Sequence, residues 1–261
     1  MIVSDHLRDL PVRFSHLKAY GRSAMHGLHA RTTEIKQTSA MQRGTAVDAL
    51  IFGHRKVIGA PMKRDERSAA YKEFLAENPD TEILTMAEFD KARWMADAIR
   101  ACEYAKPWMQ GATQATLMFD WMGLKCRATP DWRGDGFLTE LKTTVDASEY
   151  KFPWQARRMS YPVQMWMQGI ACELNGWPIS RYFIVAAESS APYVVSVFEL
   201  TPRSLDKASR QLMLWAERLK TAESSGMWTP YSEAIIPLDE PEDDPELVYP
   251  DDETEGEQPN D

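Results

Sequence analysis

Residues 126–144, CRATPDWRGDGFLTELKTT, decide the fold, because they combine the pattern of two β-strands with three charged side chains. Apolar and β-branched residues on either side of the turn residues RGDG predict a strand before the turn and another after it. Alternate side chains of a strand share a face, so Glu140 and Lys142 should point the same way as Leu138. Antiparallel pairing across the turn would then bring Asp131 beside Glu140. Two acids and a lysine are therefore expected together on one sheet.

Two carboxylates held close together repel each other unless a cation joins them. Carboxylate oxygens and water are the ligands that Mg²⁺ prefers, at roughly 2.0 to 2.1 Å. Such an ion lowers the pKa of a bound water and stabilises a pentavalent phosphate, while Lys142 orients the water or offsets the developing charge. The pattern favours phosphodiester hydrolysis. The alternative is structural: Glu140 and Lys142 lie on a solvated strand face, and Asp131 is an ordinary turn residue after Pro130.

The rest of the chain predicts a mixed α/β domain with helical N-terminal segments. Thr85 and Glu88 are spaced as a capping box at the start of the firmest helix, and Gly53 should close another. The pattern from about residue 115 predicts a three-stranded meander that includes the quoted stretch. Helices are predicted within 13–30 (the first begun at Ser15), 42–53, 85–105, 161–176 and 204–224, and strands at 180–189 and 193–201.

Charge is divided unevenly along the chain. The 261 residues carry 30 Lys and Arg against 39 Asp and Glu, a net charge of -9, yet 14 of those acids and no Lys or Arg follow Lys220. The remaining 25 acids leave residues 1–220 at +5 (30 minus 25). We predict one domain over residues 1–236 and an acidic, disordered tail over 237–261, because the tail has too few apolar residues to offset the entropy of ordering. The tail either aids solubility, or acts as a nucleic-acid mimic or partner-docking segment.

Composition also excludes several classes of protein. No stretch of roughly 18 apolar residues predicts a membrane span, and the charged start MIVSDHLRDLPVRF does not resemble a secretion signal, so the cytoplasm is expected. The three cysteines, Cys102, Cys126 and Cys172, form no CxxC pair. This spacing argues against a zinc ribbon, a cysteine-ligated iron–sulfur cluster or a disulfide framework, and predicts reduced, mostly buried thiols.

The sequence ATPDW, followed by LTELKTT and then by YPVQMWMQGIA, resembles the PD-(D/E)xK nuclease superfamily. More narrowly, residues 12–200 resemble phage-type exonucleases related to RecE (exodeoxyribonuclease VIII), to RecB nuclease domains and to lambda exonuclease. The resemblance implies a restriction-endonuclease-like core, in which a central mixed β-sheet is flanked by helices. It also implies that Asp131, Glu140 and the main-chain carbonyl of Leu141 bind the metal, and that Lys142 serves the attacking water.

The resemblance extends to two helices near the site. In the family, a helix carries a GTAxH motif; here GTAV is followed by Asp48, a harder oxygen ligand that should favour Mg²⁺ or Mn²⁺, or an inert surface carboxylate. A later family helix offers Tyr and Gln, which match Tyr161 and Gln164. These two are three residues apart and so share a helix face. Gln164 is expected to contact the reacting phosphate or its water, and Gln168 is expected to be structural; the alternative for Tyr161 and Gln164 is ordinary packing.

Two groups of residues are candidates for DNA contact. The N-terminal segment RFSHLKAYGRSAMHGLHA resembles the family's S-x-L and SP-x-x-[YH] segments, so Arg22 and Ser23 could hold a terminal 5′-phosphate. The alternative is that Ser15 and Ser23 are helix caps. Lys151, Arg157 and Arg158 precede the Tyr161 helix and are expected either to neutralise backbone phosphates or to form an ordinary solvated face.

Other polar and aromatic residues carry no functional expectation. His16, His26 and His29 match no known metal-ligand spacing, so they are assigned to the surface or the core. The tryptophans, among them Trp154, Trp166 and Trp215, are assigned to the core rather than to base stacking.

The resemblance implies a Mg²⁺-dependent exonuclease, with Mn²⁺ as an alternative metal, acting in the cytoplasm of a bacterial host cell. It would digest linear double-stranded DNA from 5′ to 3′ for phage-type recombination. Implied partners are DNA ends, a single-strand annealing protein and further copies of the chain, with no membrane. Two alternatives stay open: an endonuclease or RecB-like defence nuclease, and a DNA-binding module that has lost catalysis, which the Asp48 substitution could indicate.

Overall fold

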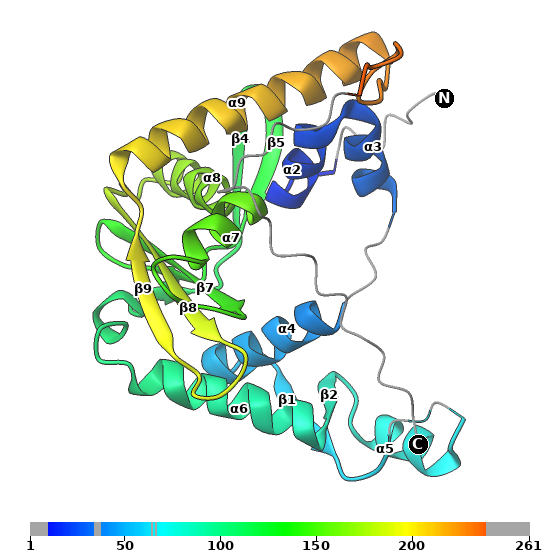
Figure 1. Ribbon diagram of the computed structural model, residues 1–261, viewed down its shortest axis with the longest axis vertical. Coiled ribbons are helices and arrows are strands. Elements are labelled where there is room, and N and C mark those ends of the chain that lie inside the picture. The colour runs from blue at the N-terminus through cyan, green and yellow to red at the C-terminus, as the bar shows by residue number, and fades with distance from the viewer. Residues whose placement is uncertain (1–9, 34–37, 64, 66, 239–261) are drawn as a thin grey trace. The chain divides into compact units, whose positions relative to one another are not determined.

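Glu140 lies on the central strand of a five-stranded sheet (Figure 1). The computed structural model describes residues 10–33, 38–63, 65 and 67–238. The sheet order is β3-β6-β7-β8-β9. Strands β7 and β8 pair in parallel, whereas the other pairs are antiparallel, so the sheet is mixed, as predicted. The strands are β3 (Ala112–Thr113), β6 (Trp132–Arg133), β7 (Phe137–Thr144), β8 (Arg181–Glu188) and β9 (Val195–Glu199).

The two faces of β7 pack into different apolar clusters. Leu138 belongs to a cluster with the later helices, and Leu141 belongs to a second cluster with the earlier ones. This alternation confirms that Glu140 shares a face with Leu138. A strand covered on both faces is typical of parallel pairing, so charges on β7 lie in a buried setting.

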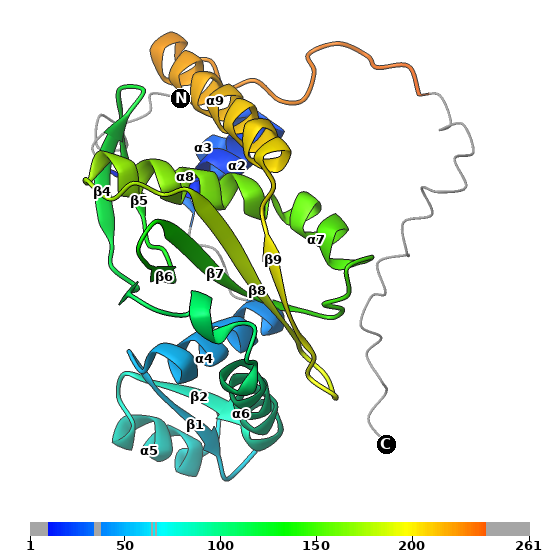
Figure 2. The ribbon, with the colours of Figure 1, turned by 90° about the vertical axis from the view of Figure 1, so that its left-hand side faces the viewer.

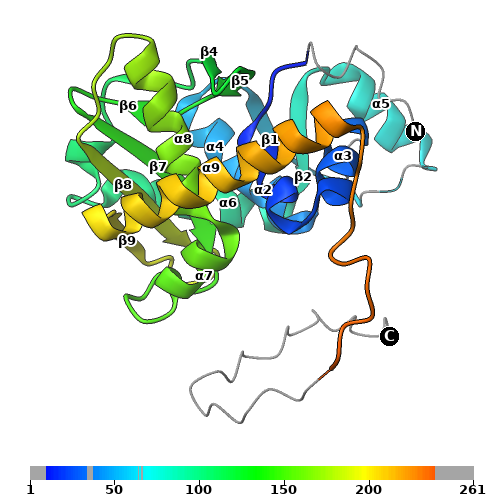
Figure 3. The ribbon, with the colours of Figure 1, turned by 90° about the horizontal axis from the view of Figure 1, so that it is seen from above.

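One face of the sheet is covered by helices α8 and α9, which lie above it in Figure 2. Helix α9 crosses α8 and also packs on α2, and Figure 3 shows that crossing from above. The helices of this layer are α2 (Phe14–Arg22), α3 (Ala24–Thr32), α7 (Phe152–Met159), α8 (Tyr161–Leu174) and α9 (Pro202–Ser225).

Helices α4 (Ser39–Phe52) and α6 (Met86–Ala101) cover the opposite face. Both ends predicted from capping chemistry are confirmed: Gly53 ends α4 in the left-handed conformation with φ 68°, and Thr85 and Glu88 form a reciprocal capping box before α6. The α/β class with helical N-terminal segments is likewise confirmed. The start assigned to Ser15 is wrong, because Arg13 is the residue at the N-cap of α2.

The predicted three-stranded meander is wrong. Strands β4 (Leu117–Trp121) and β5 (Leu124–Ala128) form a separate two-stranded sheet, and only β6 and β7 of this region join the main sheet. The break follows the Thr129–Pro130 step, because proline lacks the N–H that would continue the ladder. An unpredicted unit follows α4: β1 (Lys56–Ala60) and β2 (Thr81–Thr85) pair in parallel around α5 (Ala69–Glu77). The remaining element is the 3₁₀ turn η1 (Lys106–Trp108).

The described residues up to Pro230 belong to one compact unit, and residues 231–238 belong to a second. The tail predicted over residues 237–261 lies outside the described residues, except for 237 and 238. No described helix is both long and apolar enough to cross a membrane. Cys102, Cys126 and Cys172 are all free thiols, and the last two are buried.

Helix α8 approaches the sheet closely at a glycine. A Cβ atom added to Gly169 would lie 2.2 Å from the hydroxyl oxygen of Tyr182 on β8, and Tyr182 is itself buried. The distance from α8 to the sheet therefore depends on the absence of a side chain at this position.

We expect Gly169→Ala to lower the free energy of unfolding by about 1–3 kcal/mol, because the new methyl group displaces a buried tyrosine. The matched control is Gly44→Ala on α4, where the nearest atom to a new Cβ is 3.8 Å away. That substitution should be neutral or stabilising by up to about 1 kcal/mol, since alanine favours helix. Urea titration measures both, and equal stability of the two variants would contradict the close approach.

Candidate active site

The side chains of Glu140 and Lys142 both lie at the sheet's α8 face, two residues apart on β7. Glu140 is 4% exposed, and Lys142 Nζ donates a hydrogen bond to Glu140 Oε1 at 2.6 Å. A carboxylate this deeply buried is costly unless charge and hydrogen bonds compensate it. The structural alternative, a solvated strand face, is therefore wrong for Glu140.

Asp131 lies directly before β6 and beside Glu140. Trp132 pairs with Thr139 in the β6–β7 ladder, so Asp131 falls opposite Glu140. Asp131 is buried, and its Oδ2 accepts a hydrogen bond from the backbone N–H of Leu141 at 2.8 Å. The antiparallel pairing thus brings the two acids together, as the sequence predicted.

Gln114 holds Asp131 from the other side, although no sequence pattern singled it out. Gln114 Nε2 donates to Asp131 Oδ1 at 2.7 Å, and its backbone N–H donates to the Asp131 carbonyl at 3.3 Å. Gln114 has φ 51°, in the left-handed region that costs free energy for a residue other than glycine. The two bonds to Asp131 help to hold this conformation.

Helix α8 supplies two amide donors to Glu140. Gln164 Nε2 donates to Glu140 Oε1 at 2.5 Å, and Gln168 Nε2 donates to Glu140 Oε2 at 2.8 Å. Gln168 is buried, so the expectation that it is merely structural misses its contact with the acid. Its position four residues after Gln164, on the same helix face, was the available signal. Gln164 contacts Glu140 in this state, whereas the sequence predicted a contact with the phosphate or its water.

Tyr161 begins α8 and faces the same group. Lys142 Nζ lies 5.0 Å from the centroid of the Tyr161 ring, within the range of a cation–π contact. Tyr161 and Gln164 therefore share the predicted helix face, and that face is turned toward the acids.

Asp48 reaches the site from α4, on the opposite side of β7. The pKa of Asp48 is raised to about 7, chiefly by burial; the charge of Lys142 opposes this rise and the charge of Glu140 adds to it. These influences place Asp48 within electrostatic reach of Glu140 and Lys142. It is a half-buried carboxylate rather than the inert surface residue that the sequence allowed.

The site carries more negative charge than its surroundings compensate. Burial raises the pKa of Asp131 well above its usual range, and the charges of Glu140 and Asp48 add to this effect. Burial acts to lower the pKa of Lys142, but the charges of Glu140 and Asp131 outweigh it and raise that pKa. Three acids therefore share one ammonium group, the arrangement that a bound cation would relieve.

The fit of a metal ion can be tested on these acids. Among the described residues, no three Asp, Glu, His or Cys side chains already enclose a space for an ion. However, a carboxylate offers about four acceptor positions, and the Asp131 carboxylate accepts two hydrogen bonds from the described residues. Mutual repulsion together with the further acceptor positions fits a hard divalent cation. The N–H of Leu141 donates to Asp131. The carbonyl of Leu141, the predicted metal ligand, belongs to the residue directly after Glu140 on β7.

Cations surround the acids, and one of them was not predicted. Lys18 on α2 donates to the carbonyl of Met159 at 2.9 Å. Burial lowers the pKa of Lys18, and the charges of Lys142 and Arg158 lower it further. Lys18 thus lies within electrostatic reach of both Lys142 and Arg158, whereas Lys151 is exposed at the N-cap of α7.

The N-terminal candidates are placed differently. Ser23 is buried, and its hydroxyl caps α3 by accepting a hydrogen bond from the His26 N–H. Its oxygen also lies 2.7 Å from His26 Nδ1, so the capping alternative holds for Ser23. Arg22 is exposed at the end of α2. His16 is buried and accepts from the Arg13 N–H, as expected for a packing residue.

Trp154 contradicts its assignment to the core. Its side chain on α7 is 60% exposed, because positions 153, 154, 157 and 158 all lie on the outer face of this short helix. Trp215 is buried as predicted, and Trp166 packs at the edge of the core.

Residues 13–240 match the profile of a family described as a PDDEXK-like domain of unknown function (DUF3799). No curated protein matches the chain significantly.

Among solved structures, a candidate exonuclease from Eubacterium rectale shares the fold. It is 16% identical, with a TM-score of 0.66 over 95% of this chain and 96% of its own. An alkaline exonuclease from Laribacter hongkongensis aligns at 14% identity over 69% of this chain and 88% of its own, and its complex with dAMP aligns at 15% over 71% and 93%. Their TM-scores of 0.32 and 0.30 are too low to support a conclusion.

We expect Asp48→Asn to stabilise the metal-free protein at pH 8. The pKa of Asp48 is about 7 in the folded chain, against an ordinary 3.8. Below pH 3.8 both states hold the proton and no penalty arises; between the two values, folding must take up a proton, and stability falls as pH rises. At pH 8 the penalty is complete, and removing it should add about 1–3 kcal/mol, a range reduced from the full shift because Asp48 is only half-buried.

Urea titrations in EDTA at pH 4 and pH 8 measure this difference. The control is Asp97→Asn on α6, whose side chain is 62% exposed and should show no such pH dependence. A wild-type stability equal to that of Asp48→Asn at both pH values would contradict the repulsion within the site.

Proposed function

The chain belongs to the PDDEXK-like family of unknown function DUF3799, and from this membership we propose that it is a divalent-metal-dependent DNA exonuclease. The observation that carries the proposal is the buried group formed by Asp131 and Glu140 on adjacent strands, with Lys142 bound to Glu140. These are the residue types and the order from which the motif takes its name. A purely structural role would be hard to reconcile with burying two mutually repelling acids at the centre of the sheet.

We propose that Asp131, Glu140 and the carbonyl of Leu141 hold Mg²⁺ or Mn²⁺, with Asp48 as a further oxygen ligand. When bound, the cation would lower the pKa of a coordinated water and stabilise negative charge on the phosphate. Oxygen ligands without sulfur or imidazole suit these hard cations better than softer metals. Placing a dication here would also reverse the repulsion that raises the pKa of Asp131 and Asp48.

The chain's own groups would then orient the reactants. Lys142 remains protonated at neutral pH because its pKa is raised, so it offers positive charge rather than accepting a proton. Gln164 and Gln168 fix both oxygens of Glu140 and thereby fix its direction toward the ion. Tyr161 holds the ammonium group of Lys142 in place through its ring. Preorganised groups of this kind stabilise charge as it develops in the transition state.

The substrate and biological role follow from the resemblance rather than from the residues of the site. We propose linear double-stranded DNA, digestion from 5′ to 3′, and a role in phage-type recombination alongside a single-strand annealing protein. The exposed cations Lys151, Arg157 and Arg158 support a polyanionic substrate. A homo-oligomer belongs to the same proposal.

Glu140→Gln and Lys142→Ala should each lower the rate of DNA degradation by at least about a thousandfold, because the first removes the charge of a proposed metal ligand and the second removes positive charge that stabilises the transition state. Binding of duplex DNA in EDTA should stay within about threefold of wild type. The substrates are linear and circular duplexes with Mg²⁺ or EDTA, and the control is Glu103→Gln, whose side chain is 78% exposed.

Degradation of linear DNA alone supports the exonuclease. Nicking of circles would indicate an endonuclease or a RecB-like defence nuclease, and binding without cleavage would indicate an inactive DNA-binding module. Full activity of either variant would refute the roles assigned to the two residues.

Metal binding can be measured without activity. At Mg²⁺ concentrations about tenfold above its Kd, the folded state should gain about 1.4 kcal/mol, which raises the Tm by about 3–5 °C for a chain of this size. Asp131→Asn should show a much smaller rise. Sodium chloride at equal ionic strength is the control, and an equal rise with sodium would exclude a specific ion site.

A further inference from the structure

A groove adjoins the candidate active site on the same face of the sheet. Ile184 on β8 is the register partner of Glu140, and Phe198 on β9 is the partner of Ile184. Ile184 and Phe198 both line the groove, which has a volume of about 740 Å³. Because neighbouring strands lie about 4.8 Å apart, Phe198 is about 10 Å from Glu140 across the sheet. The volume lies within the range of ligand-binding pockets.

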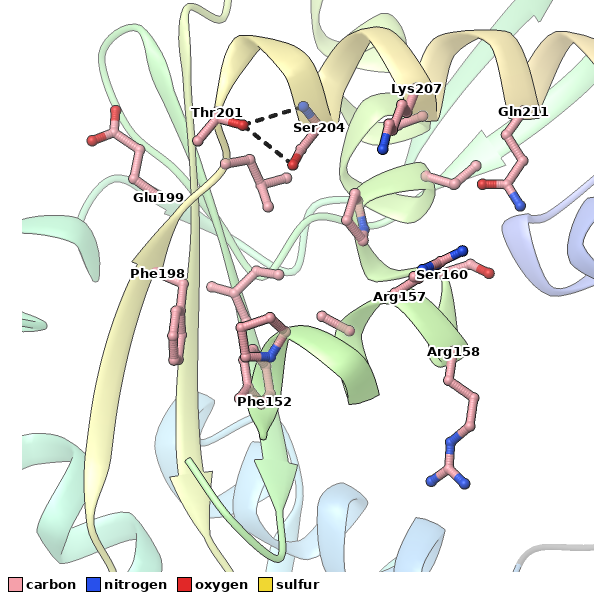
Figure 4. A pocket seen from close by; sticks show the side chains of 17 residues that line it. Phe152, Arg157, Arg158, Ser160, Phe198, Glu199, Thr201, Ser204, Lys207 and Gln211 are labelled. Carbon is pink, nitrogen blue, oxygen red and sulfur yellow. Dashed lines mark hydrogen bonds between the residues drawn. The ribbon is translucent and has the colours of Figure 1, made fainter. Parts of the chain in front are cut away.

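Helices α7 and α9 form the walls of the groove, as Figure 4 shows. Its floor is apolar: the rings of Phe152 and Phe198 stack on each other with centroids 4.7 Å apart. Polar groups lie along the walls, with Arg157 on the α7 side and Lys207 on the α9 side. The groove therefore has an apolar base and a cationic rim.

Charge in the groove favours an anion. Neither Arg157 nor Lys207 forms an ion pair within the described part of the chain. Glu199 is the acid among the lining residues, and Arg181 already binds both of its carboxylate oxygens, at 2.7 and 2.9 Å. The cations on the two walls are thus left to compensate a charge supplied from outside.

An exposed aromatic residue lies beside Arg157, one of the residues that line the groove. The guanidinium carbon of Arg157 lies 6.0 Å from the ring centroid of Trp154, and 60% of Trp154 is accessible to solvent. Tyr150, in the segment before α7, is 75% exposed. Exposed rings beside a cationic groove are characteristic of single-strand binding, in which bases stack on the rings while cations follow the phosphates.

The same cations connect the groove to the active site. Arg158 lines the groove and lies close enough to Lys18 to lower the pKa of that lysine, and Lys142 does the same from the acid side. Positive charge therefore runs from Lys142 past Lys18 and Arg158 to the groove, a path suited to a polynucleotide rather than to an isolated small anion.

We propose that the groove between α7 and α9 binds single-stranded DNA, with a base stacked on Trp154 and phosphates neutralised by Arg157 and Lys207. The bases of a duplex stack on one another and are not available to Trp154, so the groove selects the single strand. The inference rests on the proposed function, because digestion of one strand of a duplex leaves such a single strand beside the site.

Fluorescence anisotropy with a labelled (dT)20 oligonucleotide in EDTA tests this groove in the full-length protein. Trp154→Ala should weaken binding about tenfold, as expected for the loss of one stacked base. Lys207→Glu should weaken it at low salt and reduce the salt dependence, with the slope falling by about 0.7 or more. Two controls should bind within about twofold of wild type: Tyr104→Ala, an 84% exposed ring after α6, and Arg210→Ala on α9, which pairs with Asp206.

Three outcomes would overturn the inference: unchanged (dT)20 affinity in both groove variants, loss of affinity in Lys207→Glu alone, or an equal loss for a 20-base-pair duplex. Loss of affinity in Lys207→Glu alone would mean that no base stacks on Trp154 and that the groove fits any anion, an acidic peptide included. Degradation assays of the wild type with Mg²⁺ keep the two proposals apart. Cleavage with unchanged anisotropy refutes the groove alone, whereas (dT)20 binding without cleavage refutes the nuclease alone.

Discussion

Buried negative charge on the central strand is the constraint to which the surrounding elements conform. Glu140 is 4% exposed and Asp131 is 7% exposed, and ionised acids removed this far from water are tolerated only when donors reach their oxygens. The chain provides those donors from separate segments: the Leu141 N–H on β7, Gln114 before β4, and Gln164 with its neighbour one turn later on α8. Moving any of these segments would leave a buried acid without its partner, which is why the local geometry is so closely specified.

The topology of the sheet explains why α8 can supply hydrogen-bond donors to Glu140. Strands β7 and β8 are parallel, so the chain between them must cross from one end of the sheet to the other, and a helix is the usual means. A crossover helix necessarily lies over the face of the strands it connects. The glycine at position 169 then lets α8 lie close to β8, and this close packing brings the two glutamine amides within hydrogen-bond distance of Glu140. The donors for the acid therefore come from a connection that the sheet requires anyway.

Local patterns determined how much of this could be predicted from the sequence. The two-residue period of a strand predicted that Glu140 and Lys142 share a face, and the turn between two strands predicted that Asp131 lies beside them. Both acids could therefore be predicted because they are close together in the sequence. Gln114 was not predicted, because its contact with Asp131 depends on a residue in the left-handed conformation before a strand. Lys18 was not predicted, because it lies on a helix more than a hundred residues away in the sequence. The same limit applies to the fold: capping residues marked helix ends, but the parallel pairing of β1 and β2 and the separation of β4–β5 from the main sheet depend on tertiary contacts.

Asp48 shows how the same electrostatics couples stability to chemistry. The exonuclease families that the sequence resembles usually carry histidine at this position, a ligand that can bind a metal in its neutral form, whereas aspartate adds a negative charge to a site that already holds two. The added charge contributes to the raised pKa of Asp131 and makes the metal-free state less stable at neutral pH. It equally increases the attraction for a divalent cation, because each unit of unbalanced charge in a poorly solvated site interacts strongly with the ion. Under the proposed function, stability given up by the repelling acids would become affinity for the metal, which is the trade expected where function, rather than stability, selects a residue.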